Sequence, residues 1–518
     1  MGTVPNRKQD REELRGKNKN NLDRLGTVPN RKPIRKTKKE RKQKMKNKAI
    51  TPRNEDFAKW YTDVVKAARL AAYSNVKGCV VIEPNGYAIW EKMQSTLDKM
   101  FKETGHQNVC MPMLIPENLM KKEGELINGF APEVAWVTQG GEKELDERMC
   151  IRPTSETLFS DYYAGIVKSY RDLPIKYNQW CNVLRWEKET RPFLRSREFL
   201  WQEGHTIHET AKEAEDETKQ MLQIYEKFFK EYLAIPVITG RKTEKEKFAG
   251  AEYTLTVEAL MYNGVSLQSG TSHYFGQKFS KAYDISFSNR ENEQEYVYQT
   301  SWGVTTRMIG ALIMVHSDEA GLVLPPKIAP RQVVIVPIGE AEEVKNLSQK
   351  AYNELKNAGI SVYIDDSEKS PGFRFAQSEV NGIPVRIEIG ERDLKENKIT
   401  FARRDTREKL VQTADVDFAK YVEKLLEEIQ NNLYNRALER RNGLTYECTK
   451  LEEVEKIMNE KPGFVKAMWC GSEECELKMK EIKGTKSRCI LENEKHIHDK
   501  CIVCGKEAKH LVVWGIQY

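Results

Sequence analysis

Apolar residues recur every three or four positions in two segments near the beginning of the patterned part of the chain, which predicts amphipathic helices. The first segment comprises Phe57, Trp60, Val64, Ala67, Ala68 and Ala71, and ends near Ser74. The second comprises Ile89, Met93, Leu97 and Phe101. A short strand in GCVVIEP lies between them. The second helix stops at Gly105, and NVCMPMLIP is extended because its two prolines disfavour helix.

Alternation of polar and apolar residues dominates from Met149 to Val304 and predicts strands with one buried face. Hairpin-length gaps separate some of these strands, so we expect antiparallel pairing. The run KEAEDETKQMLQIYEKFFKEYL predicts a long helix.

The pattern changes after the proline-rich segment that ends at Pro330. Apolar strands in VVIVPI, SVYIDD and PVRIEIG alternate with helices, which predicts a small α/β domain with a mainly parallel sheet. A charged helix over roughly Asp417–Arg441 separates it from a cysteine-bearing segment.

Charge is unevenly distributed. The net charge is +7, but residues 1–50 hold 18 lysines and arginines against 5 acidic residues, so the rest of the chain is mildly acidic. We expect a disordered basic tail over residues 1–52 that attracts a polyanion such as RNA, or a solvated tail with no role of its own. The heptapeptide GTVPNRK occurs twice in this tail, which indicates a duplicated leader or a gene-model error.

Length and hydropathy limit the class of protein. The 518 residues suit about three domains. No apolar run approaches the ~18 to 20 residues of a membrane span, and no signal segment opens the chain. We therefore expect a soluble, cytoplasmic protein without a membrane partner.

The segment VLRWEKETRPFLRSREFLWQEGH, residues 183–205, combines charges with large aromatic rings. If it is a hairpin, the strand VLRWE places Arg185 and Glu187 on one face, because side chains of a strand alternate. The shared face of the returning strand holds Phe199, Trp201, Glu203 and His205. A guanidinium binds paired phosphate or carboxylate oxygens and an aromatic ring stacks on a flat ring, so the hairpin suits a nucleotide and an anion. A salt-bridge network on a sheet surface is the alternative interpretation.

Three more polar segments strengthen the hypothesis of a ligand site. CIRPTSET carries Thr154 and Glu156, a hydroxyl and a carboxylate that could fix a small amine. SWGVTTRMIGALIMVH ends as an apolar helix with Arg307 in its first turns. LQSGTSHYFGQ contains, close to two glycines that allow close approach of a ligand, Gln268, Ser269, Thr271, Ser272 and His273. A helix cap, a surface arginine and a turn are the corresponding structural alternatives.

Five of the ten cysteines lie in the last 50 residues. CGSEEC and CIVC provide two chelating pairs that suit a tetrahedral structural zinc ion, and disulfides are a weaker hypothesis without a secretory signal. The four ligands would be Cys470, Cys475, Cys501 and Cys504. Other candidates are Cys489, His496 and His498, and a reduced cluster without metal is the remaining alternative.

The order of these motifs resembles that of a class II aminoacyl-tRNA synthetase, specifically a prolyl-tRNA synthetase of the archaeal and eukaryotic-like type. The segment with Gly105 and Pro112 matches motif 1 of the class, RWE at residues 185–187 opens motif 2, and GVTTR, ending at Arg307, is motif 3. The segments that resemble the proline enzymes in particular are RPTSE, FLWQEGH, SGTSHYFGQ and LVLPPKIAPRQVVIVPIG. The resemblance covers about residues 53–518.

This resemblance implies three domains. They are an α+β catalytic domain over residues 53–330, with an antiparallel sheet flanked by helices, an α/β anticodon-binding domain over 331–435, and a small zinc-binding α+β domain over 436–518. It also implies ATP-dependent formation of prolyl-adenylate, followed by transfer of the prolyl group to the 3′ end of tRNA(Pro). The implied ligands are L-proline, ATP, Mg²⁺ and structural Zn²⁺. A homodimer would form through motif 1, and membership of a larger synthetase complex is left open.

Site residues follow from the resemblance by position in the motifs. Arg185 and Arg307 would be catalytic, the first between the proline carboxylate and the α-phosphate and the second over the adenine, opposite Phe199. The ATP site would comprise Arg185, Glu187, Arg195, Phe199, Gln268, Thr271 and Arg307. The proline site would comprise Thr154, Glu156, Arg185, Trp201, Glu203, His205, Phe248 and His273. Anticodon bases would meet Arg386, Glu388 and Arg392, for which strand-end charges in water are the alternative.

Two further expectations concern the ends of the resemblance. The carboxylate of Tyr518 would reach toward the catalytic domain. Arg185 and Arg307 are 122 residues apart, a length that the predicted strands and helix fill, so we expect no editing domain between motifs 2 and 3.

Other functions are disfavoured by single features. A threonine enzyme would need a catalytic zinc site, and the core motifs contain no set of one cysteine and two histidines; serine and glycine enzymes are the other sister classes. An RNA-binding regulator that has lost chemistry would lack Arg185, Glu187 or Arg307, and all three are present.

Overall fold

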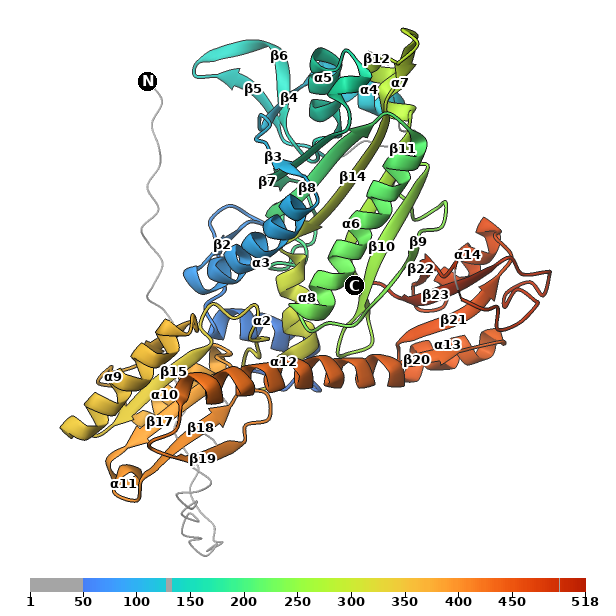
Figure 1. Cartoon of the computed structure of the whole chain (residues 1–518). Helices are drawn as coiled ribbons and strands as arrows, with labels where there is room; N and C mark the ends of the chain where they lie inside the picture. Colours follow the sequence, from blue (N-terminus) through green and yellow to red (C-terminus); the bar gives the residue numbers. More distant parts are fainter. Residues whose placement is uncertain (1–49, 127–132, 493) are drawn as a thin grey trace, which may run out of the picture. The chain divides into compact units, whose positions relative to one another are not determined.

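A computed structural model describes residues 50–126, 133–492 and 494–518 (Figure 1). The basic tail with its repeated heptapeptide, for which we predicted disorder and a polyanion partner, lies outside the described residues. Within the described ranges, no helix combines the length and the apolar character that a membrane crossing requires.

The described residues contain a main sheet of eleven strands. Its part from the predicted catalytic domain runs, in spatial order, β9 (Val237–Arg241), β10 (Tyr253–Leu260), β11 (Ser266–Gly276), β14 (Tyr298–Thr305), β8 (Glu198–His208), β7 (Ile175–Leu184) and β3 (Gln107–Asn108). Neighbours from β9 to β7 pair antiparallel, and β3 joins β7 in parallel. The predicted antiparallel sheet is confirmed.

Amphipathic helices provide the apolar core behind this sheet. They are α2 (Phe57–Ala67), α3 (Pro84–Glu103), α6 (Ala211–Glu231) and α8 (Arg307–His316). Helix α6 lies along β10, β11 and β14 (Figure 1). It begins at a capping box in which Thr210 and Glu213 bond each other's backbone N–H groups, and its Tyr225 and Phe228 are buried with Trp302 of β14.

Smaller strands and helices outside the main sheet complete this first segment. The strands are β1 (Ala71–Tyr73), β2 (Val80–Ile82), β4 (Leu114–Pro116), β5 (Trp136–Gly140), β6 (Lys143–Ile151), β12 (Ser286–Ser288) and β13 (Gln294–Tyr296). The helices are α4 (Glu117–Leu126), α5 (Glu156–Ile166), the short η1 (Tyr170–Asp172) and α7 (Lys278–Tyr283). A separate apolar cluster joins α5 and α7 to β11 through Phe159, Phe279 and Phe275.

The next segment forms a mixed α/β sheet of order β16 (Val362–Ile364), β15 (Val333–Ile338), β17 (Val385–Gly390), β18 (Lys398–Arg403) and β19 (Lys409–Thr413). Strands β15, β16 and β17 are parallel, as predicted, but β18 and β19 add an antiparallel hairpin that the sequence pattern did not predict. Helices α9 (Glu342–Asn357), α10 (Pro371–Val380), α11 (Glu391–Leu394) and α12 (Phe418–Gly443) complete it. The predicted charged helix is α12, and Asp417 caps its first turn through Lys420 N.

The last segment contains strands β20 (Thr445–Glu447), β21 (Phe464–Trp469), β22 (Thr485–Ile490) and β23 (His510–Ile516), with helices α13 (Leu451–Glu460) and α14 (Glu473–Glu481). Strand β22 pairs with β9 where Ile490 lies opposite Arg241. The last segment therefore extends the sheet of the first, a continuity that the sequence did not predict. The boundaries at residues 330 and 435 stay predictions.

Two predictions about local structure were wrong. The first helix ends at Ala67, because Arg69 adopts a positive φ of 52° and Ala71 already begins a strand. The strand in VLRWE ends at Leu184, before Arg185 and Glu187. There the chain leaves the strand, and Arg185 N donates to the carbonyl oxygen of Arg197 at 2.7 Å.

A pH-dependent contact links the segment after α8 to the mixed sheet. The carboxylate of Asp318 accepts hydrogen bonds from Arg404 at 2.9 and 2.7 Å and from Arg407 at 2.7 Å. Burial alone would raise the pKa of Asp318, but the two guanidinium groups hold that pKa well below its usual range. The stabilisation is therefore complete above about pH 4 and is lost as the pH falls toward the lowered pKa.

We predict that Asp318→Asn lowers the free energy of unfolding by about 2 kcal/mol at pH 7, because it weakens hydrogen bonds to charged groups. The difference from the wild type should shrink as the pH falls below about 4. Thermal unfolding between pH 3 and pH 7 measures it, with the exposed Asp366→Asn as control. A difference that stays constant over this range would contradict the assignment.

Candidate active site

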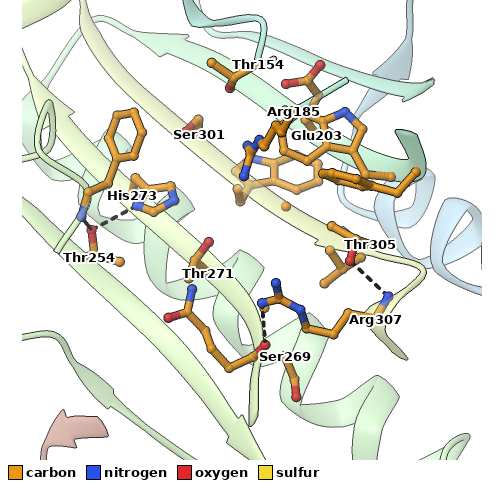
Figure 2. A pocket seen from close by; sticks show the side chains of 18 of the residues that line it. Thr154, Arg185, Glu203, Thr254, Ser269, Thr271, His273, Ser301, Thr305 and Arg307 are labelled. Carbon is orange, nitrogen blue, oxygen red and sulfur yellow. Dashed lines mark hydrogen bonds between the residues drawn. The ribbon is translucent and has the colours of Figure 1, made fainter. Parts of the chain in front are cut away.

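One face of the main sheet lines a cavity of about 480 Å³ (Figure 2). The residues predicted for the ATP and proline sites all line it: Thr154, Glu156, Arg185, Glu187, Arg195, Phe199, Trp201, Glu203, His205, Phe248, Gln268, Thr271, His273 and Arg307. The structure thus brings together side chains that the sequence places in five separate segments.

Strand register produces this convergence. Ser301 of β14 lies opposite His205 of β8 on one side and His273 of β11 on the other. Two residues further along, Gly303 lies between Glu203 and Thr271. Residues two apart share a face, so both rows point into the cavity. Glycine adds no side chain, which leaves the middle of the cavity floor open.

Arg185 enters the cavity from the end of β7. Its Nε donates to the carbonyl oxygen of Pro153 at 3.0 Å, and its guanidinium carbon lies 5.3 and 5.6 Å from the ring centroids of Trp201 and Phe199. Solvent reaches Arg185 through the mouth of the cavity, while protein surrounds it elsewhere. This enclosure lowers its pKa, and the charge of Glu156, among others, opposes the shift.

Arg307 enters the same cavity from the first turn of α8. Its Nη1 donates to the carbonyl oxygen of Gln268 at 3.2 Å, and its backbone N–H donates to Thr305 Oγ1 at 3.0 Å (Figure 2). Burial, and then repulsion from Arg185 and Arg195, lowers its pKa to about 10. The guanidinium stays charged at neutral pH.

This end of the cavity is suited to an anion. Within the described residues, no carboxylate forms an ion pair with Arg185 or Arg307. Arg195 lies 4.0 Å from the nearest carboxylate oxygen of Glu187. A phosphate group would relieve the mutual repulsion of the three guanidinium groups and would accept their remaining N–H donors.

The other end of the cavity is acidic. Thr154 donates to Glu156, and Ser155 donates to Glu203. His205 Nε2 lies 3.2 Å from the second oxygen of Glu203. Burial would raise the pKa of Glu203, but these partners, His205 above all, hold it below its usual range. The carboxylate is therefore ionised at neutral pH.

This acidic group suits a small cation. Ligand atoms of Glu156, Glu203 and His205 lie within 4.8 Å of one another. Both carboxylates accept a hydrogen bond from a hydroxyl and keep further lone pairs, so an ammonium group with several N–H donors would find acceptors on each side. The same atoms could hold a metal ion.

An aromatic and imidazole wall closes the cavity beside this acidic group. The rings of Phe248 and His273 lie 5.1 Å apart, and Thr254 Oγ1 lies 2.9 Å from His273 Nδ1 (Figure 2). Burial, reinforced by His205, lowers the pKa of His273 to about 3. His273 is therefore neutral at physiological pH and adds no charge to the wall.

Other lining residues were missed in the sequence. Ser301 and Thr305 follow the same alternation as Gly303 in SWGVT, so strand periodicity could have identified them. Lys242, Glu246 and Lys247 lie in a charged run that is typical of a solvated loop, so no sequence signal separated them from surface residues.

Two arginines in and next to the motif 2 loop, Arg191 and Arg197, have partners within the chain. Arg197 donates through Nη1 to the carbonyl oxygen of Lys77 at 3.1 Å and stacks over Trp186. Arg191 donates to the phenol oxygen of Tyr518, whose own N–H donates to Ser266 O at 2.9 Å. Tyr518 thus contacts the motif 2 loop through its phenol, and the expectation that its carboxylate reaches toward the catalytic domain stays a prediction.

The predicted cysteines form a separate group near the C-terminus. In the part of the chain that the structure describes, the sulfur atoms of Cys470, Cys475, Cys501 and Cys504 lie within 4.8 Å of one another. The Cys470 sulfur lies 3.7 Å from those of Cys475 and Cys504. Four sulfurs at ~2.3 Å from a tetrahedral zinc ion would be about 3.8 Å apart, so the spacing fits zinc.

The thiols of this set differ in pKa, since burial raises the pKa of Cys470 and of Cys475. A hydrogen bond from the backbone of Lys506 lowers the pKa of Cys504 to about 7, which favours a thiolate. Cys489 is buried outside the group, and burial raises its pKa to about 12. His498 Nδ1 instead accepts the N–H of Lys500 at 3.0 Å.

The predicted anticodon residues do not all meet. Arg386 and Glu388 share a face of β17 and form a buried pair at 2.9 Å. The guanidinium of Arg386 lies 4.4 Å from the ring centroid of Phe375 and borders a small basic cavity of about 50 Å³. Arg392 is exposed on α11 and does not line this cavity.

Three family models match the chain. Residues 136–316 match a tRNA synthetase class II core domain (G, H, P, S and T), residues 332–428 an anticodon binding domain, and residues 451–518 a prolyl-tRNA synthetase C-terminal domain.

Whole-chain relatives agree with these matches. A proline–tRNA ligase of Clostridium novyi (strain NT) is 55% identical over 92% of this chain and 100% of its own length. One from Lachnoclostridium phytofermentans is 57% identical over 91% of this chain and 98% of its own length. A crystal structure of prolyl-tRNA synthetase from Cryptosporidium parvum, complexed with halofuginone and AMPPNP, is similar with a TM-score of 0.87 and 39% identity, over 91% of this chain and 99% of that one.

Proposed function

The chain belongs to the class II prolyl-tRNA synthetases and is a proline–tRNA ligase, and we propose that its cavity first joins proline to AMP and then transfers the prolyl group to tRNA(Pro). One observation carries the assignment of the site. Arg185 and Arg307, which form no ion pair with a carboxylate of the described residues, line the same cavity as the acidic group of Glu156, Glu203 and His205. An amino acid next to a nucleotide phosphate has this charge pattern. The similar Cryptosporidium structure holds AMPPNP, an ATP analogue.

In the first step, the proline carboxylate attacks the α-phosphate of ATP and pyrophosphate leaves. The charge of Arg185 acts on Arg307 and is itself affected by Glu156 and Glu203, so Arg185 lies close enough to both groups that it would bind a carboxylate oxygen and an α-phosphate oxygen together. Arg307 would cover the adenine from the side opposite Phe199, and Glu187, Arg195, Gln268 and Thr271 would complete the ATP site. Bound together with ATP, Mg²⁺ would supply positive charge near the phosphate oxygens. The protein contributes position and electrostatic stabilisation, so the step requires no general base.

The acidic end would hold the proline ring. Thr154 and Glu156 would accept the N–H groups of the secondary ammonium, and Glu203 supplies a second negative charge nearby. Trp201, His205, Phe248 and His273 would form the wall around the ring. Alanine is smaller and still fits, so the pocket rejects it by only about 1–3 kcal/mol for each missing methylene group.

In the second step, the ribose hydroxyl at the 3′ end of tRNA(Pro) attacks the prolyl carbonyl and AMP leaves. We propose that the mixed sheet binds the anticodon, with Arg386, Glu388 and Arg392 as candidate contacts. The basic cavity that Arg386 lines with Arg404, Arg407 and Lys409 supports Arg386 most strongly, since a guanidinium can donate to the acceptors on the edge of a guanine. A homodimer through motif 1 is part of the same proposal.

The decisive experiment is amino-acid-dependent exchange of pyrophosphate into ATP. We expect exchange with proline, and we expect Arg185→Lys to reduce kcat/KM by about 10²- to 10³-fold, because lysine cannot bind two oxygens with a planar fork. The exposed Arg331→Lys is the matched control. Exchange with threonine but not proline would contradict the proposal, and no exchange with any amino acid would favour a binding protein.

We propose that the four cysteines hold a structural zinc ion. When bound, zinc would crosslink α14 to the loop of Cys501 and Cys504. Purified protein should contain about one zinc per chain, and the double variant Cys501→Ser, Cys504→Ser should contain none and should unfold at lower temperature. Cys489→Ser is the control, because its thiol lies outside the group. Metal analysis that finds no zinc in the wild type would overturn this proposal.

We also propose that the chain has no editing domain between motifs 2 and 3. The chain from Arg185 to Arg307 forms β8–β11 and β14 of the main sheet, the helices α6 and α7, and the separate two-stranded sheet of β12 and β13. We expect purified protein not to hydrolyse preformed alanyl-tRNA(Pro) above the uncatalysed rate. Faster hydrolysis in a deacylation assay would contradict it.

A further inference from the structure

The loop between β9 and β10, residues 242–252, forms one wall of the cavity. Lys242, Glu246, Lys247 and Phe248 all line it. The backbone N–H of Phe248 donates to Thr254 Oγ1 at 3.1 Å, the same hydroxyl that contacts His273. The position of this loop therefore affects the wall around the acidic end.

The C-terminal segment holds this loop through a buried hydrogen bond. Thr243 Oγ1 donates to Glu476 Oε1 of α14 at 2.8 Å. Ser487 of β22 donates to the same carboxylate oxygen, and its Oγ lies 3.1 Å from Thr243 Oγ1. All three side chains are buried, with Thr243 only 1% exposed. A buried carboxylate with these partners fixes the hydroxyl of Thr243 firmly.

The same threonine starts the turn that carries the lining residues. Its carbonyl oxygen accepts the N–H of Glu246 at 3.1 Å and that of Lys247 at 2.9 Å. Phe248 follows directly in the chain. A displacement of Thr243 would therefore move the turn and Phe248 with it.

Further contacts between the two segments surround this bond. Lys245 pairs with Glu473 at 3.0 Å and Lys486 pairs with Glu246 at 3.1 Å. These pairs reach the surface, where water and salt screen them, so each contributes little to stability. The buried Thr243–Glu476 hydrogen bond is therefore the better candidate for the contact that fixes the position of the loop.

A second set of buried side chains links the loop to the C-terminal segment. Glu258 of β10 binds the lining residue Lys242 at 2.8 Å and Arg488 of β22 at 2.9 Å. All three are buried, and burial lowers the pKa of Lys242 while Glu258 opposes the shift. The start of the turn is thus tied to α14 through Thr243, and to β22 through Lys242 and Glu258.

We propose that Glu476 is a positioning residue for the amino-acid pocket, acting through Thr243 on the loop that carries Phe248. The inference rests on the proposed proline site. The bond should govern proline affinity and not ATP affinity, because the candidate ATP contacts lie on the motif 2 loop and on β8, β11 and α8. Glu476 thus makes the C-terminal domain part of the amino-acid specificity of the enzyme.

The test compares side chains that differ by one hydrogen bond. Thr243→Val removes the hydroxyl at nearly constant volume, and Thr243→Ser retains it. We expect Thr243→Val to raise the KM for proline about tenfold in pyrophosphate exchange, with the KM for ATP changed less than about twofold. Thr243→Ser should restore the wild-type KM. The dissociation constant of proline, followed by tryptophan fluorescence, should rise in parallel.

A second pair tests the partner. Glu476→Gln should raise the KM for proline in the same direction, and Glu474→Gln, an exposed glutamate on the same helix, should leave it unchanged. The double variant Thr243→Val, Glu476→Gln should show less than the sum of the two effects, because both remove one interaction. Thermal unfolding identifies any variant that does not fold.

Three results would overturn the proposal. They are an unchanged KM for proline in folded Thr243→Val and Glu476→Gln, an equal rise in the KM values for proline and ATP, or a failure of Thr243→Ser to restore the KM. A wild-type enzyme without proline-dependent exchange would refute the proposed function itself, and this inference with it.

Discussion

The register of the antiparallel strands is the constraint on which the rest of the structure depends. A slip of one residue between β8 and β14 would turn Glu203 and His205 to the opposite face of the sheet. That face is already occupied: Gly204 points to it, and a Cβ there would lie 2.1 Å from the ring of Trp302. The core behind the sheet therefore holds the register that opens the cavity in front of it.

Within this frame, the chemistry follows from separation of charge. Arg185 and Arg307 form no ion pair with a carboxylate of the described residues, and in the same cavity the carboxylates of Glu156 and Glu203 accept hydrogen bonds from hydroxyls. Both sets are fixed in advance by backbone carbonyls and by neighbouring hydroxyls, such as Pro153 O for Arg185. Preorganised charges of this kind stabilise a reacting carboxylate and phosphate without moving during the reaction.

The C-terminal segment is a structural part of this site. Its β22 extends the catalytic sheet beyond β9, its Arg488 shares Glu258 with Lys242, and its Tyr518 meets Arg191 of the motif 2 loop. A buried charge that loses its partner is costly, so these contacts tie the segment to the cavity more strongly than exposed ion pairs would. Together with the Thr243–Glu476 bond, they give a segment without lining residues of its own an influence on the pocket.

The sequence alone determined the elements that depend on local spacing. Periodicity placed α3, α6 and α12, alternation placed Phe199, Trp201, Glu203 and His205 on one face of β8, and the paired cysteines indicated one cluster. Every residue that the family resemblance assigned to the ATP or proline site lines the cavity, although the individual roles of these residues stay predictions.

Only the tertiary structure decided what depends on contacts between distant segments. The edge pairing of β22 with β9, the burial of Lys242 and Thr243 within a charged run, and the partners of Arg191 and Arg197 left no local signal. Period and composition report which way a side chain faces along its own element. They do not report which element packs against it, because that is set by the packing of surfaces far apart in the chain.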